Sequence, residues 1–144
     1  MNFRPVDFAE FPVHCHFALS RLQTQRSGGV LRATVRGTFG IGSGGNIHAR
    51  YLCGMITAAH ATWRPAALLL DLSSLVYTWG DSMADLLDAG GDLGVPSAVV
   101  VGLPCQQALA TLMFQDVNTT HNATEREGVF DKLEEATEWL QGKI

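Results

Sequence analysis

Apolar and polar side chains alternate along residues 31–39, a pattern that is typical of a β-strand with one buried face. Residues 16–26 alternate more weakly, and Ser27, Gly28 and Gly29 between the two segments are typical of a hairpin turn. We therefore expect two antiparallel strands at the start of the fold. Residues 1–12 have no periodicity and contain two prolines, so we interpret them as a loosely held arm before a single domain, residues 13–144.

Helical and buried-strand patterns alternate in the rest of the chain. Apolar residues recur at helical spacing from Ile47 to Ala59, and Pro65 ends the pattern. Two continuous apolar runs, residues 66–72 and 97–103, predict strands that are buried on both faces of a sheet. The first of these runs should be a central strand.

Three further helices are expected in the second half of the chain. The first covers residues 84–89 and ends at Gly90-Gly91, and the second is opened by Pro104. The last begins after Asp131, with Glu134 placed as in a capping box. Some part of residues 117–130 must return to the sheet. The order predicts an α/β fold, a small mixed sheet of four to five strands with about four α-helices packed on it.

Composition narrows the class of protein. The chain has 144 residues, of which 47% are hydrophobic and 17% charged, and this suits one globular domain. Its formal net charge of −4 offers no attraction for nucleic acid or anionic lipid, so a protein or a small molecule is the expected partner. The three cysteines are widely spaced, and neither a signal peptide nor a membrane segment is recognisable, so we expect a cytoplasmic location.

A glycine-rich segment follows the second predicted strand. Gly40, Gly42 and Gly45 fit the pattern G-x-G-x-x-G, and Asn46 begins the next helix. Backbone N–H groups of such a loop can hold an anionic group at a helix N-terminus. Asp71 follows farther along than the usual acidic partner of a dinucleotide site, and the chain is short for the full dinucleotide fold. A small-molecule or nucleotide-sensing module is the alternative hypothesis that this loop supports.

Other reactive side chains suggest no catalytic or metal site. His14 and His16 would point the same way on a strand, but no further ligands cluster near them in the sequence. Cys105 stands at an expected helix start, where a thiolate would be favoured, yet no general base can be assigned to it. We therefore predict no enzyme activity, no metal and no cofactor.

The segment Tyr77-Thr78-Trp79-Gly80-Asp81-Ser82-Met83 lies between the first buried strand and a helix. Ligands and regulatory modifications concentrate at such junctions in α/β proteins. Asp81 or Ser82 should cap the helix by accepting a hydrogen bond from a free backbone N–H.

The stretch LLLDLSSLVYTWGDSMADLL, together with PSAVVVG and the closing VFDKLEEATEWL, resembles a STAS domain, the fold of bacterial anti-anti-sigma factors. The resemblance runs from about Gly28 to Leu140. It implies a non-enzymatic regulatory domain that binds a protein partner, such as an anti-sigma kinase or a sensor complex. In that family a D-S-S-G-L-like loop opens a helix, and its second Ser, or a Thr there, is phosphorylated by the partner kinase.

Aligned without gaps from Asp71, the family's phosphoacceptor falls on Asp81, whereas a slip of one residue makes Ser82 the acceptor. An Asp carries about one negative charge where phosphoserine carries ~1.5 to 2, so the switch is in doubt. The resemblance implies a partner surface formed by loop 78–83 and the start of the following helix. Its expected members include Thr78 near the switch and the contact residues Tyr77, Trp79, Gly80 and Met83. Self-association stays open.

Overall fold

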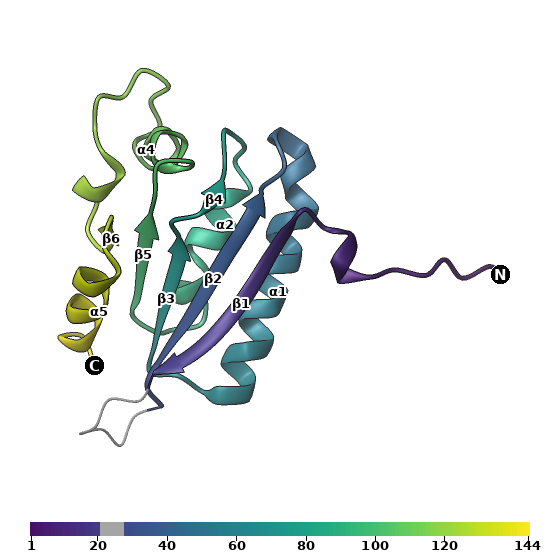
Figure 1. Ribbon diagram of the computed structural model, residues 1–144, viewed down its shortest axis with the longest axis horizontal. Coiled ribbons are helices and arrows are strands. Elements are labelled where there is room, and N and C mark those ends of the chain that lie inside the picture. Colours follow the sequence, from purple (N-terminus) through teal and green to yellow (C-terminus); the bar gives the residue numbers. More distant parts are fainter. Residues whose placement is uncertain (21–27) are drawn as a thin grey trace.

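A mixed β-sheet forms the centre of the protein (Figure 1). The computed structural model describes residues 1–20 and 28–144. Six strands are joined in the order β1-β2-β3-β5-β6, with β4 beside the end of β2. Their bounds are β1 (Val13–Ser20), β2 (Val30–Thr38), β3 (Ala67–Leu72), β4 (Leu75–Val76), β5 (Ser97–Val101) and β6 (Val129–Phe130). Strand β1 runs antiparallel to β2, and the other pairings are parallel. The predicted α/β class is confirmed.

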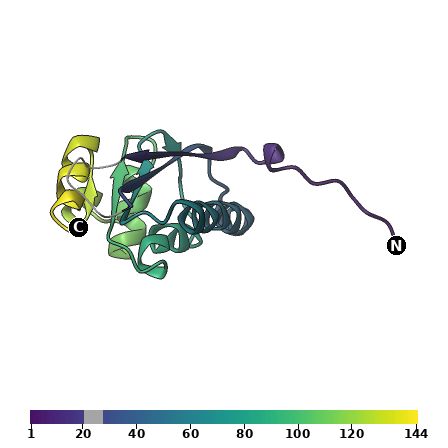
Figure 2. The same cartoon turned by 90° about the horizontal axis from the view of Figure 1, so that it is seen from below.

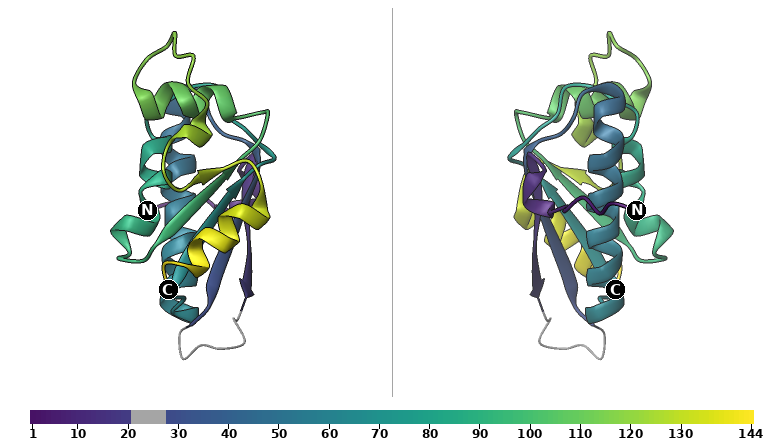
Figure 3. Two further views of the ribbon diagram at one scale, coloured as in Figure 1. Left: turned by 90° about the vertical axis from the view of Figure 1, so that its left-hand side faces the viewer. Right: turned by 90° about the vertical axis from the view of Figure 1, so that its right-hand side faces the viewer.

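Helices cover the two faces of this sheet unequally (Figures 2 and 3). The α-helices are α1 (Asn46–Trp63), α2 (Met83–Leu87), α3 (Ala89–Asp92), α4 (Gln106–Phe114) and α5 (Leu133–Gln141), and 3-10 turns occur at η1 (Phe8–Glu10), η2 (Gly42–Gly45) and η3 (Ala123–Glu125). Helices α1 to α4 pack on one face, whereas α5 alone packs on the other. No helix within residues 1–20 and 28–144 is long and apolar enough to cross a membrane.

Strand β3 is the central element, as its apolar run predicts. All six of its residues are buried. Leu68, Leu70 and Leu72 belong to the larger core cluster beneath α1 to α4, while Ala67 and Leu69 belong to a smaller cluster beneath α5. A parallel strand with both faces buried needs apolar side chains on both, because helices exclude water from each face.

The hairpin of β1 and β2 has the predicted arrangement. Leu31, Ala33 and Val35 are buried, whereas Arg32 and Thr34 between them are half-buried and Arg36 is exposed. Strand β1 begins at Val13, three residues earlier than the alternation suggested. The predicted turn includes Ser27, which lies outside the described residues.

Several predicted helix ends are wrong in detail. Gly90 and Gly91 lie within α3 rather than ending a helix, and the chain turns instead near Gly94, which has a φ of 73°. Helix α4 begins at Gln106, so Pro104 precedes it without occupying its first position. Helix α2 begins at Met83, one residue earlier than predicted.

The predicted capping box at the last helix is also wrong. Lys132 is the N-cap residue of α5, and its side chain makes no capping hydrogen bond. A capping box does occur earlier, where the Asn122 side chain accepts from the N–H of Thr124 and the Glu125 side chain accepts from the N–H of Asn122. The predicted apolar face of α5 is present, with Ala136 and Leu140 buried.

The N-terminal arm is held at one end. The ring of Phe8 stacks on Tyr51 of α1 at 5.1 Å between centroids, and Phe11 stacks on the same ring at 4.7 Å. Met1, Phe3 and Val6 remain exposed, and the arm runs away from the sheet (Figures 1 and 2).

Two glycines in regular elements should respond oppositely to alanine. Gly37 of β2 has a φ of 99°, and a Cβ there would lie 2.1 Å from the Pro12 carbonyl oxygen. A Cβ on Gly54 of α1 would meet nothing within 4 Å. Gly37→Ala should lower the free energy of unfolding by about 1–3 kcal/mol, because the residue is both strained and obstructed. Gly54→Ala should raise it by about 0.5–1 kcal/mol. Urea unfolding measures both, and equal effects would refute this packing of the hairpin.

Candidate functional site

Two loops that were predicted as separate sites pack against each other. The N–H of Gly42, in the glycine-rich loop, donates to the carbonyl oxygen of Trp79 at 3.3 Å. A Cβ on Gly42 would lie 2.6 Å from the Trp79 ring, and a Cβ on Gly80 would lie 3.1 Å from the Gly42 nitrogen. Both glycines have positive φ, 56° for Gly42 and 132° for Gly80. Glycine at these positions therefore permits a close contact between the loops.

The amides of the glycine-rich loop are used inside the protein. The N–H of Gly40 donates to Nδ1 of His48 at 2.9 Å, and that of Gly44 donates to the Ile41 carbonyl at 3.0 Å. Together with the Gly42 bond, these contacts occupy three of the N–H groups that an anion would need. Of the expected anion cradle of Gly40, Gly42, Gly45 and Asn46, the N–H groups of Gly40, Gly42 and Asn46 donate within the protein, the last to the Ser43 carbonyl. Anion binding at this loop stays a prediction, and it would have to replace these bonds.

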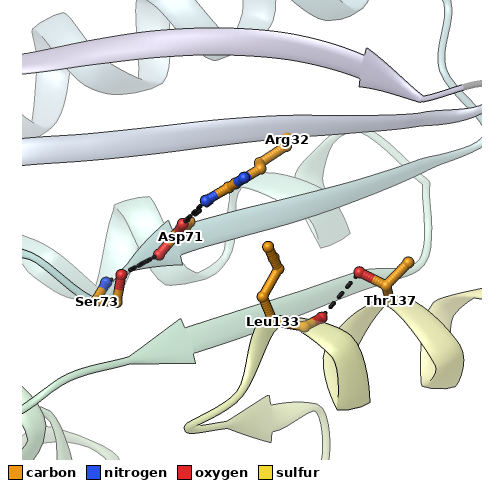
Figure 4. Close-up of polar contacts among 5 residues, drawn as sticks. All are labelled: Arg32, Asp71, Ser73, Leu133 and Thr137. Atoms are coloured by element: carbon orange, nitrogen blue, oxygen red, sulfur yellow. Dashed lines mark hydrogen bonds and ion pairs between the residues drawn. The ribbon is translucent and has the colours of Figure 1, made fainter.

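Asp71 is likewise engaged within the sheet (Figure 4). Its Oδ2 accepts from Nε and Nη2 of Arg32, at 3.2 and 2.5 Å, and its Oδ1 accepts from the hydroxyl and the N–H of Ser73, at 2.6 and 3.0 Å. Burial alone would raise the pKa of Asp71, but the hydrogen bonds from Ser73 and Arg32 hold it below its usual value. This carboxylate joins β3 to β2 and is not free to bind a ribose.

The segment 77–83 divides into buried and exposed members. Tyr77 is 2% exposed, and its hydroxyl donates to the Gly80 carbonyl at 2.6 Å. Burial, with the nearby charge of Asp81, raises the pKa of Tyr77 to about 12. Met83 is fully buried in the core. Tyr77 and Met83 are therefore not surface contacts, contrary to the prediction, and instead they anchor the loop from within.

The exposed members are Thr78, Trp79 and Asp81. Trp79 is 61% exposed although it rests against Gly42. Such a large apolar side chain held at the surface is a typical protein-contact residue.

The Ser82 side chain does not form the predicted cap of α2. The residue occupies the N-cap position, but its side chain makes no capping hydrogen bond. Its Oγ is buried and has no hydrogen-bond partner among the described residues. A Cβ added to Gly45 would lie 3.1 Å from this oxygen, which shows how closely the glycine-rich loop covers it. As folded here, the Ser82 hydroxyl is not presented to a kinase.

Two hollows flank Asp81. One, of about 560 Å³, lies between the loop and the end of α4, and it is lined by residues 77–81, Ala84, Ala108, Thr111, Leu112 and 115–117. The other, of about 610 Å³, is lined by Asn46, Ala49, Arg50 and Cys53 of α1 and by Asp81, Ser82 and Asp85. Sequence patterns could not reveal that α4 forms a wall of the first hollow, because its residues are distant along the chain and carry no motif.

The remaining candidates lie elsewhere. Cys105 is buried, its thiol donates to the Leu72 carbonyl at 3.2 Å, and burial raises its pKa, so it is not an exposed thiolate. His14 and His16 are exposed on β1. In the part of the chain that the structure describes, no three His, Cys, Asp or Glu side chains gather as a metal site requires.

Comparison with solved structures identifies the fold. A crystal structure of an anti-sigma factor antagonist from Mycobacterium paratuberculosis superposes with a TM-score of 0.58, over 89% of this chain and 95% of that one, at 19% sequence identity. The fold is STAS-like. This confirms the architecture that the sequence motifs implied. No family model and no curated protein matches the sequence.

The fold places the loop 78–83 at the carboxyl ends of the parallel strands, beside the start of α2. The STAS-like loop predicted from the sequence therefore exists as a strand-to-helix junction. Its surface is narrower than expected, since Trp79, Thr78 and Asp81 are exposed whereas Tyr77 and Met83 are not.

His48 should make this loop region sensitive to pH. Its ring is buried between the edges of Phe11 and Phe39, and Nδ1 accepts the Gly40 N–H, which only an unprotonated Nδ1 can do. Burial lowers the pKa of His48 below its ordinary value. The unfolded chain therefore binds the proton first, and stability should fall as pH drops below about 6.5.

Unfolding in urea at a series of pH values between about 7.5 and 5.5 tests this linkage. In His48→Asn the side-chain oxygen can accept the same hydrogen bond without titrating. The wild type should lose more stability than this variant as the pH falls. Parallel curves for the two proteins would show that His48 is not responsible.

Proposed function

We propose that the chain is a non-enzymatic regulatory domain that binds a protein partner in the cytoplasm, an anti-sigma kinase or a sensor complex, through the loop 78–81 and the start of α2. The observation that carries the proposal is the exposure of Trp79 on a loop that packs against the glycine-rich loop. The STAS-like fold is shared with an anti-sigma factor antagonist, a protein whose stated role is to oppose another protein. Such a role needs a surface and no catalytic group.

The contacts that restrain the loop carrying Trp79 support a role in binding. Hydrogen bonds at Gly42 and Gly80 restrain the loop before any partner arrives. A restrained aromatic anchor loses little conformational freedom on binding, and this favours affinity. The adjoining hollow has an exposed apolar side chain, Val117, at its far side. We infer that the partner inserts a side chain there, between the loop and α4.

Asp81 supplies a fixed charge to this surface. It is exposed, and it stands at the acceptor position in the ungapped alignment. Ser82, the acceptor in the slipped alignment, has a buried hydroxyl. We infer that the domain stays in one charge state and is not switched by phosphorylation.

Replacement of Trp79 tests the binding surface. Titration calorimetry with purified anti-sigma factor kinases of the source organism should identify a partner that Trp79→Ala binds at least about thirtyfold more weakly, as expected for a central aromatic anchor. Trp63→Ala is the matched control, since Trp63 is 51% exposed at the end of α1, away from the loop. Equal affinity of the two variants would contradict the proposed surface.

Phosphorylation tests the fixed charge. After incubation with the binding kinase and ATP, the wild type should gain no phosphate by intact-mass measurement. Asp81→Ser should gain one, because an exposed hydroxyl then stands at the acceptor position. A phosphate on the wild type that is lost in Ser82→Ala would overturn the inference and favour the slipped alignment.

A further inference from the structure

Strand β1 is an edge strand with free backbone groups. No described strand pairs with its outer side. The N–H of Thr38 donates to the Pro12 carbonyl. Pro12 and Thr38 are therefore a hydrogen-bonded pair just beyond the end of the β1–β2 register. Because hydrogen-bonding direction alternates along a strand, the backbone groups of the even-numbered residues face β2. Those of Val13, Cys15, Phe17 and Leu19 therefore point out of the sheet.

This edge lacks the usual protection. Proteins commonly blunt an edge strand with Pro, Lys, inward charges or a covering segment. Over its eight residues β1 contains no Pro, Lys, Asp or Glu. The arm that precedes it runs away from the strand (Figure 1). The edge can therefore accept an added strand.

The sheet surface beside this edge is open and basic. Helix α5 packs over β3, β5 and β6 and also covers Val30 at the start of β2, but it leaves most of the same face of β1 and β2 uncovered (Figure 3). His14, His16 and Arg36 are exposed there, and Arg36 stands directly across from His14 in the register. The side chain of Arg32 is 39% exposed. Asp71 is the one acidic residue in β1, β2 and β3, and Arg32 already neutralises it.

We propose that the β1 edge and the basic face formed by His14, His16, Arg32 and Arg36 bind an extended acidic segment of a protein partner. The segment adds as a strand next to β1, and its main chain hydrogen-bonds the outward groups of Val13, Cys15, Phe17 and Leu19. Every second side chain then projects onto the basic face, where carboxylates meet the guanidinium of Arg36. This surface is separate from the loop 78–81.

A protein segment fits better than a nucleic acid. The domain carries a net charge of −4, and this repels a nucleic acid, which has a charge on every nucleotide, more strongly than a short peptide with a few carboxylates. Arg32 is already paired with Asp71, so Arg36 is the main charge on this face and would neutralise few phosphates. An acidic strand instead uses main-chain hydrogen bonds for affinity and needs few charges for selectivity.

The test uses a labelled peptide of alternating Glu and Thr that is long enough to match β1, with fluorescence anisotropy as the readout. Replacing Glu by Gln in the peptide, or Arg36 by Glu in the protein, should each weaken binding about tenfold. Arg50→Glu is the control, because Arg50 is exposed on α1 on the opposite face of the sheet. It should bind like the wild type.

Amide hydrogen exchange then locates the peptide. Protection is expected at the amides of Val13, Cys15, Phe17 and Leu19. The urea unfolding curve of Arg36→Glu should match that of the wild type, so that weaker binding by this variant reflects the lost charge and not a loss of folding. Equal binding of the Glu and Gln peptides would overturn the proposal. So would protection confined to residues 78–81, or tighter binding of oligothymidylate or of anionic phospholipid vesicles than of the acidic peptide.

Discussion

Burial of β3 on both faces is the constraint on which the rest of the molecule depends. An apolar strand in the middle of a sheet must be covered twice, and the chain covers it with α1 to α4 on one side and with α5 on the other. The cover is unequal. One helix cannot span the whole back face, so most of the part that belongs to β1 and β2, beyond Val30, stays open and carries polar side chains.

The same central strand fixes where the candidate site lies. Strands β2, β3 and β4 run parallel, so the segments that follow them emerge at one end of the sheet. There the glycine-rich loop and the loop 78–83 meet, and the contact of Gly42 with Trp79 and Gly80 makes them a single surface. Tyr77 and Met83 support this surface from the core, while Trp79 and Asp81 present it to solvent.

Patterns that depend on neighbours in the sequence were sufficient for most of the fold. The alternation around Leu31 and the apolar run of β3 predicted their strands, because burial acts directly on those residues. The two residues of β4 are too few to show a period. The site was harder to predict, since Tyr77 packs against Phe39 and the Ser82 hydroxyl is covered beside Gly45, and both contacts are far away in the sequence. A glycine that admits a tryptophan looks the same in sequence as a glycine that admits a phosphate.

The proposed partner surface is made by these two loops. It can be tested by amide hydrogen exchange of the domain, measured free and in complex with the purified anti-sigma kinase that binds it. Exchange should slow on complex formation at residues 78–81 and at residues 115–117, which line the same hollow. A stable complex in which both segments exchange as fast as in the free domain would contradict it.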